Sequence, residues 1–435
     1  MLSQRNMRTQ QVSVPYSRPM VHKVYSRNIA DKLFVGILLI TQIYYGYRYA
    51  FQYGDSNTST YSDTPTAFQA GKYIIVILGV FGITLLSALN SKTARPRLQK
   101  SGVFIMALLF IFFVYASLIA LYTSSRTGRG FEEIYLIKAL FIFPLLFLIP
   151  LHFSAFWSID AYFKAIVKWG MIYHLAYTII MLAAFIFAGR IPGLSWPGGI
   201  TRFGGGWDDP NAFGVFLLLP LLTCFALKSS WKKGAALLVV SSLILLTLSF
   251  TAIAACIAGV FFYAFLRNAM ARLFGALIFL IVIGYVGYLS FEIPSGLLEI
   301  LAYKQESAES HISQFSIGDL LAENDPIKFL FGDHDELYFN ESFYVALMVS
   351  HGLFGLLLLI TIILLTLANA IVKIKFSRSQ GDERANTYIS IMASFVFGFA
   401  VACNATPQLV VFPGNLYFWV CVVLIWLTPT AAINK

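Results

Sequence analysis

Apolar runs long enough to cross a lipid bilayer follow one another along almost the whole chain, and they constrain its fold more than any other feature. A helix of about 17 or more apolar residues crosses the roughly 30 Å hydrocarbon layer. Runs of this kind occupy residues 33–51, 73–90, 103–122, 134–152, 163–188, 211–227, 234–249, 251–266, 273–290, 343–371, 388–404 and 414–432. With 58% hydrophobic residues and 12% charged residues, the chain is predicted to be an all-α, polytopic integral membrane protein of about twelve transmembrane helices.

Lysine and arginine predict the orientation of these helices. Basic residues cluster in the segment 1–32 and in every second loop after it, for example at Lys92, Lys228 and Arg378. Short loops rich in lysine and arginine stay in the cytoplasm. We therefore expect both termini to be cytoplasmic. The net charge of +10 is spread over these loops, which argues against nucleic acid as a partner.

Three further features narrow the class of protein. The first apolar run follows a polar segment and lacks a small-residue cleavage site, so we expect an anchor and not a signal peptide. The four cysteines lie within or beside apolar runs without paired spacing, which indicates packing residues. The sequence contains neither a GxxxxGK[ST] nor a GxGxxG motif. Any chemistry must therefore use a substrate that arrives already activated.

The loop 190–210 is expected on the extracytoplasmic side and ends in the stretch GGITRFGGGWDDPNAFG. Asp209 and Pro210 are typical of a helix N-cap and a first helical position. The three glycines allow a close approach to a ligand, and a flexible turn would also need them. The guanidinium of Arg202 suits bidentate contact with phosphate, worth about 4 kcal/mol at about 4 Å before desolvation. The alternative is an arginine that snorkels at the interface.

The second extracytoplasmic loop, residues 291–340 between the ninth and tenth helices, holds about half of the chain's 21 carboxylates. The segments SGLLEILAY and SIGDLLAE have amphipathic helical spacing, so we expect a helical capping loop. Most of its carboxylates are expected to be solvated, and their spacing matches no specific metal site. We expect neither a metal nor a cofactor.

The second loop ends in FGDHDELYFNESFYVALMVSHGLFG, which turns from acidic to apolar at the start of the segment 341–435. Glu341 is expected in the first helical turn, where the helix dipole favours a carboxylate. Tyr344 follows on the same face, and His334 is a second titratable candidate. We interpret His351, well inside the apolar run, as a packed polar group, and His174 in the same way.

These two motifs together resemble the O-antigen ligase and polymerase superfamily. The chain has an R(x)nGxxxDPNxFG motif that opens a helix, a large loop, and then an [H/E/D]SxYxxLxxxxGLFGLLL helix. The resemblance runs from Arg190 to Leu359 by motif and over the whole chain by topology. The matching positions are Arg202, Asp209, Pro210 and Asn211 in the first motif, and Tyr344, Gly352 and Gly355 in the last.

The chain departs from the family at two places. Glu341 stands where ligases of the family usually carry a histidine, which favours a polymerase. The family often has a Ser-Arg pair that brings a second arginine to the diphosphate, and here Ser249 is followed by Phe250. Either the pair lies elsewhere in the sequence, or another cation replaces its arginine. The cations available on the outer side are Arg126, Arg129, Lys138 and Arg190.

The resemblance implies a polysaccharide polymerase of the bacterial inner membrane, acting in O-antigen, exopolysaccharide or capsule assembly. Such a glycosyltransferase joins undecaprenyl-diphosphate oligosaccharide units on the periplasmic face, with a flippase and a chain-length regulator as partners. Arg202 would stabilise the leaving diphosphate. Glu341 first, and His334 second, would deprotonate the acceptor hydroxyl, which would attack with inversion. The expected substrate-binding residues are Arg202, Arg190, Asp209, Asn211, Tyr344, Lys138 and Arg126.

Three alternatives stay open. A ligase of the same family would transfer the glycan to lipid A core or to protein. A transporter of polysaccharide or lipid-linked oligosaccharide would also have about twelve helices, with ionisable groups near the bilayer midplane and broken helices in matching halves. A structural scaffold would explain the hydrophobicity, but it leaves the charged glycine loop and the capping loop without a purpose.

Overall fold

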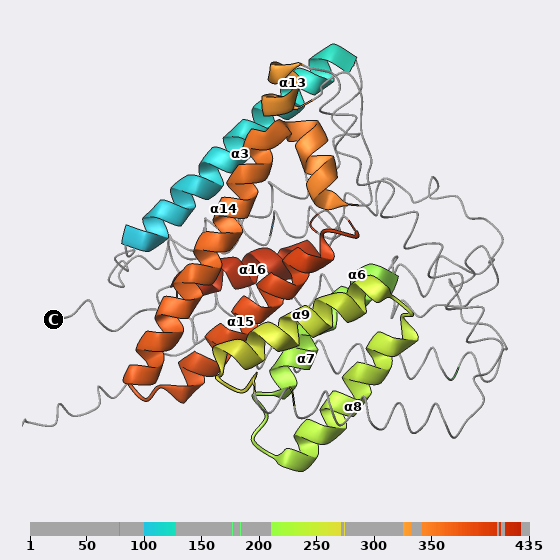
Figure 1. The fold of residues 1–435 in the computed structure, drawn as a ribbon, viewed down its shortest axis with the longest axis vertical. Helices are drawn as coiled ribbons and strands as arrows, with labels where there is room; N and C mark the ends of the chain where they lie inside the picture. The colour runs from blue at the N-terminus through green and yellow to red at the C-terminus, as the bar shows by residue number, and fades with distance from the viewer. Residues whose placement is uncertain are drawn as a thin grey trace, which may run out of the picture.

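The computed structural model describes residues 100–127, 210–270, 325–332, 342–406 and 414–427, and the single positions 78, 176, 183, 274 and 409. The described elements are all helices: α3 (Lys100–Thr127), α6 (Pro210–Phe216), α7 (Leu218–Cys224), α8 (Ser230–Leu246), α9 (Phe250–Leu266), α13 (Pro326–Phe331), α14 (Phe343–Ser379), α15 (Glu383–Ala402) and α16 (Gly414–Leu427) (Figure 1). The expected spans 33–51, 73–90, 134–152, 163–188 and 273–290 lie almost wholly outside the described residues.

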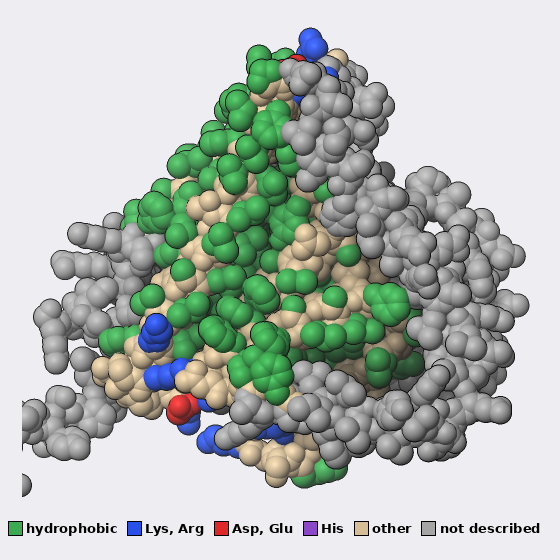
Figure 2. Space-filling view, viewed as in Figure 1, with side chains coloured by type: hydrophobic (Ala, Val, Ile, Leu, Met, Phe, Trp, Pro, Cys, Tyr) green, Lys and Arg blue, Asp and Glu red, His purple; other side chains and the backbone are tan. Residues whose placement is uncertain are grey.

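Three of the described helices are long and apolar enough to cross a membrane, namely Gly102–Thr123, Phe343–Ser379 and Glu383–Ala402. Shorter apolar helices run over Pro210–Cys224, Phe250–Leu266 and Gly414–Trp426. Large apolar side chains are exposed along α3 and α14, and Figure 2 shows them covering this face of the molecule. Over the described residues, the prediction of an all-helical chain with membrane-length apolar helices is confirmed.

Helices α9 and α15 form an antiparallel pair. A methyl group at Gly259 would lie 3.1 Å from the carbonyl oxygen of Ser394, and one at Gly398 would lie 2.5 Å from that of Ala255. The two glycines therefore let the backbones approach closely, as small residues do between membrane helices. The Leu218 side chain of α7 packs against both glycines, so α7 joins this pair.

The expected span 211–227 consists of two short helices, α6 and α7, which join at Leu217. Pro220 explains the interruption, because a proline has no N–H for the carbonyl four residues earlier and its ring crowds that carbonyl. The helical path nevertheless continues, since the Leu217 amide donates to Phe213 O and the Leu221 amide donates to Leu217 O, each at 3.0 Å. The two helices therefore act as one apolar unit with a local irregularity.

The boundary expected near Ser249 is confirmed. Helix α8 ends at Leu246, Leu248 has a positive φ of 48°, and α9 begins at Phe250. The Ser249 hydroxyl accepts the amide hydrogen of Ala252 at 3.1 Å, which is the N-cap bond that starts a helix. One continuous apolar stretch of sequence therefore forms two separate helices.

Helix α14 turns sharply at Gly352, where φ is 67° and ψ is −178°. Figure 1 shows two legs that meet at an apex, with α13 lying over that apex. We call Phe343–His351 the short leg and Leu353–Ser379 the long leg. The sequence predicted one straight helix over 343–371, and the structure corrects this: the short leg folds back, so the membrane-length part is the long leg.

Two side chains tie the long leg and the apex to neighbouring helices. Tyr115 of α3 donates its hydroxyl to the carbonyl of His351 at 2.5 Å, a carbonyl at the point where the turn interrupts the helix. Lys373 is buried and donates from Nζ to the carbonyls of Ile425 and Trp426, each at 2.8 Å. These carbonyls belong to the last turn of α16, which has no helical partners for them.

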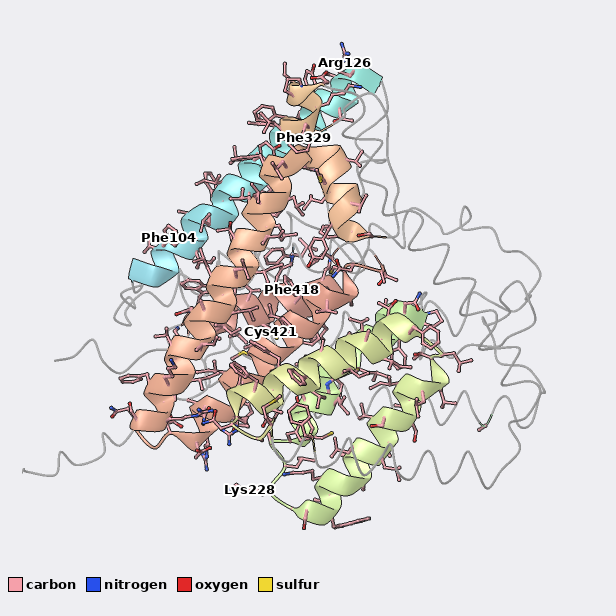
Figure 3. The ribbon with its side chains drawn as sticks, viewed as in Figure 1. Phe104, Arg126, Lys228, Phe329, Phe418 and Cys421 are labelled. Atoms are coloured by element: carbon pink, nitrogen blue, oxygen red, sulfur yellow. The ribbon has the colours of Figure 1, made fainter. Side chains whose placement is uncertain are left out.

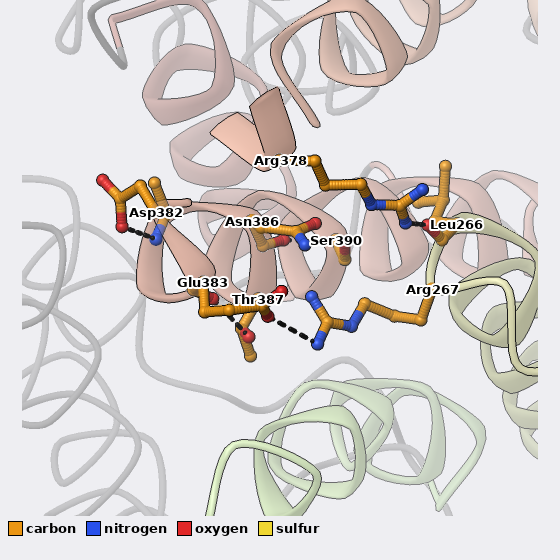
Figure 4. Close-up of polar contacts among 9 residues, drawn as sticks. Leu266, Arg267, Arg378, Asp382, Glu383, Asn386, Thr387 and Ser390 are labelled. Carbon is orange, nitrogen blue, oxygen red and sulfur yellow. Dashed lines mark hydrogen bonds and ion pairs between the residues drawn. The ribbon is translucent and has the colours of Figure 1, made fainter. Parts of the chain in front are cut away.

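The carboxyl-terminal ends of α9 and α14 and the amino-terminal end of α15 meet in a polar cluster (Figure 4). Arg267 pairs with Glu383 at 2.9 Å, and Arg378 donates to the carbonyl of Leu266. The Asp382 carboxylate accepts the Ala385 amide at 3.0 Å and caps α15. Lys228, in the neighbouring α7–α8 loop, and Arg126 lie at opposite ends of the molecule in Figure 3.

Candidate functional site

Two polar contacts join the segments that carry the sequence motifs to the α9–α15 pair. Ser249, before α9, donates its hydroxyl to the side-chain oxygen of Asn211 in the first motif at 2.7 Å. The amide of Phe343, at the start of the short leg, donates to the carbonyl of Cys403 just after α15 at 2.9 Å. Each motif therefore begins its helix beside one member of the pair.

The register of α9 against α15 places these two contacts at the same end of the pair. Arg267 meets Glu383 at one end, Gly259 faces Ser394 in the middle, and Ala255 faces Gly398 beyond it. Continuing this antiparallel register brings the start of α9 level with the end of α15. We call this level the motif end. The polar cluster of Figure 4 marks the other end.

The first motif forms the start of α6, as expected. Pro210 is the first residue of the helix, where its fixed φ is suited to helix initiation. A methyl group at Gly214 would lie 2.5 Å from Cβ of Ala252 and 3.0 Å from Oγ1 of Thr247. This glycine lets α6 lie directly against α9. Part of the DPNxFG pattern is thus explained by packing, and Asp209 lies outside the described residues.

The last motif begins at a buried helix start. Ser342 is 3% exposed and Phe343 is fully buried. The Tyr344 hydroxyl donates to the carbonyl of Ala400 at 2.8 Å, which fixes its ring on the last turn of α15. The hydroxyl proton is therefore engaged, so a contact of Tyr344 with a substrate would use the oxygen as an acceptor.

The glycines of the GLFG pattern shape the apex. A methyl group at Gly352 would overlap the backbone of Leu330 and Phe331 in α13, and one at Gly332 would overlap Ser350. A methyl group at Gly355 would lie 2.7 Å from Cβ of His351. Gly352 and Gly332 are needed for the turn and for the close packing of α13, and Gly355 leaves room for the side chain of His351. Their role is structural, because they shape the turn at which the short leg ends.

His351 is a packed residue, as the sequence indicated, with 1% of its surface exposed. Its Nδ1 lies 2.7 Å from the hydroxyl of Ser350, and that hydroxyl donates to the carbonyl of Ala346 at 2.6 Å. These contacts hold the imidazole ring against the short leg of α14, next to the apex.

The structure bears on the missing second arginine. Ser249 contacts Asn211 of the first motif. The next residue, Phe250, is half exposed and carries no charge. The replacement by another cation and a pair elsewhere in the sequence both stay predictions.

The predicted site residues are only partly covered by the described structure. Asn211 and Tyr344 lie at the motif end, while Figure 3 shows Arg126 at the tip of α3, beyond the apex. Tyr115 contacts the apex, and Arg126 follows it by about 16 Å along the helix at 1.5 Å per residue. Arg129, Lys138, His174, Arg190, Arg202, Asp209, His334 and Glu341 lie outside the described residues.

Sequence reasoning missed several residues that position the site. The sequence places Ser249 at a helix boundary, where a serine before an apolar run is a recognisable N-cap signal, but it does not indicate the bond to Asn211. Tyr115 and Cys403 act through a hydroxyl–carbonyl and a carbonyl–amide contact with α14. Nothing in the local sequence of either residue indicates such a partner far along the chain.

Comparisons with known proteins add no further assignment. No protein-family model matches the chain, and a search of curated proteins finds no match.

Proposed function

We propose that the protein is a membrane glycosyltransferase that joins oligosaccharide units carried on undecaprenyl diphosphate. The observation that carries this proposal is the meeting of both motifs at the motif end, where Asn211 bonds to Ser249 and Phe343 bonds to Cys403. The two motifs are separated by more than a hundred residues of sequence. A shared location is what a single active site requires of them.

Two of the proposed site residues are sequence neighbours of residues at this end. Asp209 directly precedes the buried Pro210, and Glu341 directly precedes the buried Ser342. Consecutive Cα atoms lie 3.8 Å apart.

The depth of the motif end suits a lipid-linked donor. Helix α9 has 17 residues, so it measures about 25 Å, somewhat less than the roughly 30 Å hydrocarbon layer. Its basic end, with Arg267, is the cytoplasmic end by the positive-inside rule. The motif end then lies in the periplasmic half of the bilayer, one short leg below the apex of α14, on the side where the diphosphate of a membrane-anchored donor is found.

In the proposed reaction, Arg202 and a second cation bind the diphosphate and stabilise the charge that develops as the glycosidic C–O bond breaks. Glu341 accepts the proton of the acceptor hydroxyl, with His334 as the second candidate. The hydroxyl oxygen forms the new bond from the opposite face, and undecaprenyl diphosphate leaves with the bonding electrons. The anomeric centre is inverted.

A variant panel tests this assignment in purified protein supplied with the native undecaprenyl-diphosphate oligosaccharide. Arg202→Ala and Glu341→Gln are each expected to lose at least about 100-fold in turnover. The matched controls are Arg384→Ala and Glu383→Gln, both in the first turn of α15 at the opposite end; both are expected to keep their activity. Full activity of both Arg202→Ala and Glu341→Gln at normal protein levels would remove the mechanism.

A transporter is the second candidate, because the structure contains broken apolar helices at Gly352 and Pro220. Discontinuous helices are typical of secondary transporters, together with ionisable groups near the midplane. In the described helices, the charged side chains of the membrane-length segments lie in the first or last turns or, as Lys373 does, close to the polar end. The described charges therefore favour the enzyme.

A further inference from the structure

Helix α13 exposes an apolar face instead of burying it. Ile327 is 69% exposed, and Leu330 and Phe331 are each 43% exposed. These residues follow the i, i+3, i+4 spacing that places side chains on one face of a helix. A helix that packs on a protein core turns such a face inward, so the orientation of α13 calls for an apolar partner outside the protein.

The position of α13 is fixed by the apex of α14. Gly332 lies against Ser350, and Leu330 and Phe331 lie against Gly352, so closely that no side-chain carbon fits at either glycine. The Asp325 carboxylate caps the helix by accepting the amide hydrogens of Ile327 and Lys328 at 2.9 and 3.3 Å. The exposed apolar face is therefore held in place and is not a fraying end.

The length of the long leg sets the depth of the apex. Residues 353–372 carry no charged side chain, and Lys373 follows. Twenty helical residues measure about 30 Å, the thickness of the hydrocarbon layer. If Lys373 marks one boundary of that layer, Gly352 marks the other. Helix α13, which lies on Gly352, is then at the junction of acyl chains and headgroups.

The exposed face of α13 is continuous with the lipid-facing surface of the long helices. Phe354 and Leu357 of the long leg are 44% and 51% exposed. Phe354 contacts the ring of Tyr115 on α3 at a centroid distance of 4.8 Å. Figure 2 shows apolar side chains extending over α3 and α14 up to α13. This continuity identifies lipid as the partner.

We propose that α13 is an interfacial membrane helix whose Ile327, Leu330 and Phe331 side chains insert among the lipid acyl chains beside the apex of α14. Amphipathic helices at this depth bury their apolar face in the boundary region. Bilayer contact would hold the apex, and with it the short leg, at a constant depth. The proposal does not depend on which reaction the motif end performs.

Site-directed fluorescence quenching in lipid nanodiscs tests this proposal. The four native cysteines are buried, so a bimane label reports on an introduced cysteine. Ile327→Cys and Leu330→Cys are the test positions. Leu357→Cys on the long leg serves as the lipid-facing control, and Ser125→Cys at the exposed end of α3 serves as the water-facing control.

Lipids with a nitroxide on the upper acyl chain are expected to quench the labels at 327 and 330 as strongly as the label at 357. Iodide in the buffer is expected to quench them far less than the label at 125. Strong iodide quenching without lipid quenching would overturn the proposal, because the face would then be in water. Protection from both quenchers would overturn it as well, because protein would then cover the face.

Discussion

Glycines at the apex of α14 carry conformations that other residues rarely adopt. Gly352 has φ 67° and ψ −178°, and Gly332 has φ 98° and ψ 163°, a region of backbone space that is essentially reserved for glycine. The two backbones also approach so closely that a methyl group at either position would overlap the other segment. The backbone angles and the close approach each require glycine at these two positions, so the turn depends on both glycines.

Replacing Gly352 by alanine is expected to lower the free energy of unfolding by about 3 kcal/mol or more, through backbone strain and overlap with α13. Gly381 has a positive φ of 70° but open space around it, so Gly381→Ala should cost only about 1 kcal/mol. Gly234→Ala, in a helix with open space, should stabilise by about 0.5 kcal/mol. Thermal unfolding of the detergent-solubilised variants by tryptophan fluorescence measures the order. Equal effects at 352 and 381 would contradict the close seating of α13.

The Asn211–Ser249 hydrogen bond predicts an energetic coupling between the two segments. Ser249→Ala removes both this bond and the N-cap bond of α9, for a loss of about 1–2 kcal/mol. Asn211→Ala removes the first bond and leaves the N-cap bond of α9 in place. A double-mutant cycle on unfolding free energies should give a coupling of about 1 kcal/mol. Additive effects would show that the contact contributes no stability.

At the scale of helices, Lys373 of α14 supplies hydrogen-bond donors to the end of another helix, α16. It donates to two carbonyls in the last turn of α16, and a cation at this position also favours the helix dipole. From sequence, Lys373 and Lys375 look alike, since both belong to a basic stretch that predicts orientation. Burial separates them, because Lys373 is 2% exposed and Lys375 lies in solvent.

Lys373→Met is expected to destabilise the protein by about 2 kcal/mol, because it leaves buried helix-end carbonyls without their donor. Lys375→Met removes the same charge from the same end of α14 and should change stability by less than about 0.5 kcal/mol. Both variants are compared by thermal unfolding in one detergent. Similar stabilities for the two variants would argue against Lys373 as the cap of α16.

The break in α14 shows what sequence patterns could and could not predict at this scale. The run 343–371 is mostly apolar and contains no Asp, Glu, Lys or Arg, and a glycine inside such a run is tolerated in a straight helix. The turn at Gly352 depends on α13, which arrives from a different part of the chain. By contrast, the division at Ser249 was predictable because its N-cap bond is local. The sequence therefore predicts the division at Ser249, which depends on a local bond, but not the turn at Gly352, which depends on contact with another segment.

At the scale of the whole molecule, the basic loops and the apolar helices agree with one topology. Lys228 and Arg126 lie at opposite ends, as the alternation of basic loops requires. The sequence predicted the helical class and the spans near 103–122, 251–266 and 388–404, because hydrophobic length is read directly from composition. The meeting of the two motifs was predicted from the resemblance alone. The motif sequences themselves do not indicate it, because each motif bonds to α9 or α15 and not to the other motif.

The orientation predicts which positions react with a membrane-impermeant maleimide in intact cells whose outer membrane has been opened. Ser125→Cys should be labelled without lysis, and Lys228→Cys should be labelled only after the inner membrane is opened. Buried native cysteines keep the background low. Labelling of Lys228→Cys before that opening, with Ser125→Cys protected, would reverse the topology and place the motif end in the cytoplasm.

The central claim is that the motif end joins lipid-linked oligosaccharide units to one another. Its most direct test is to incubate the purified protein with its native undecaprenyl-diphosphate oligosaccharide as the sole sugar substrate and to separate the products by size. The account predicts a ladder that grows by whole repeat units. A competent substrate that never changes in size would contradict it, leaving a ligase that needs a different acceptor or a transporter as the remaining candidates.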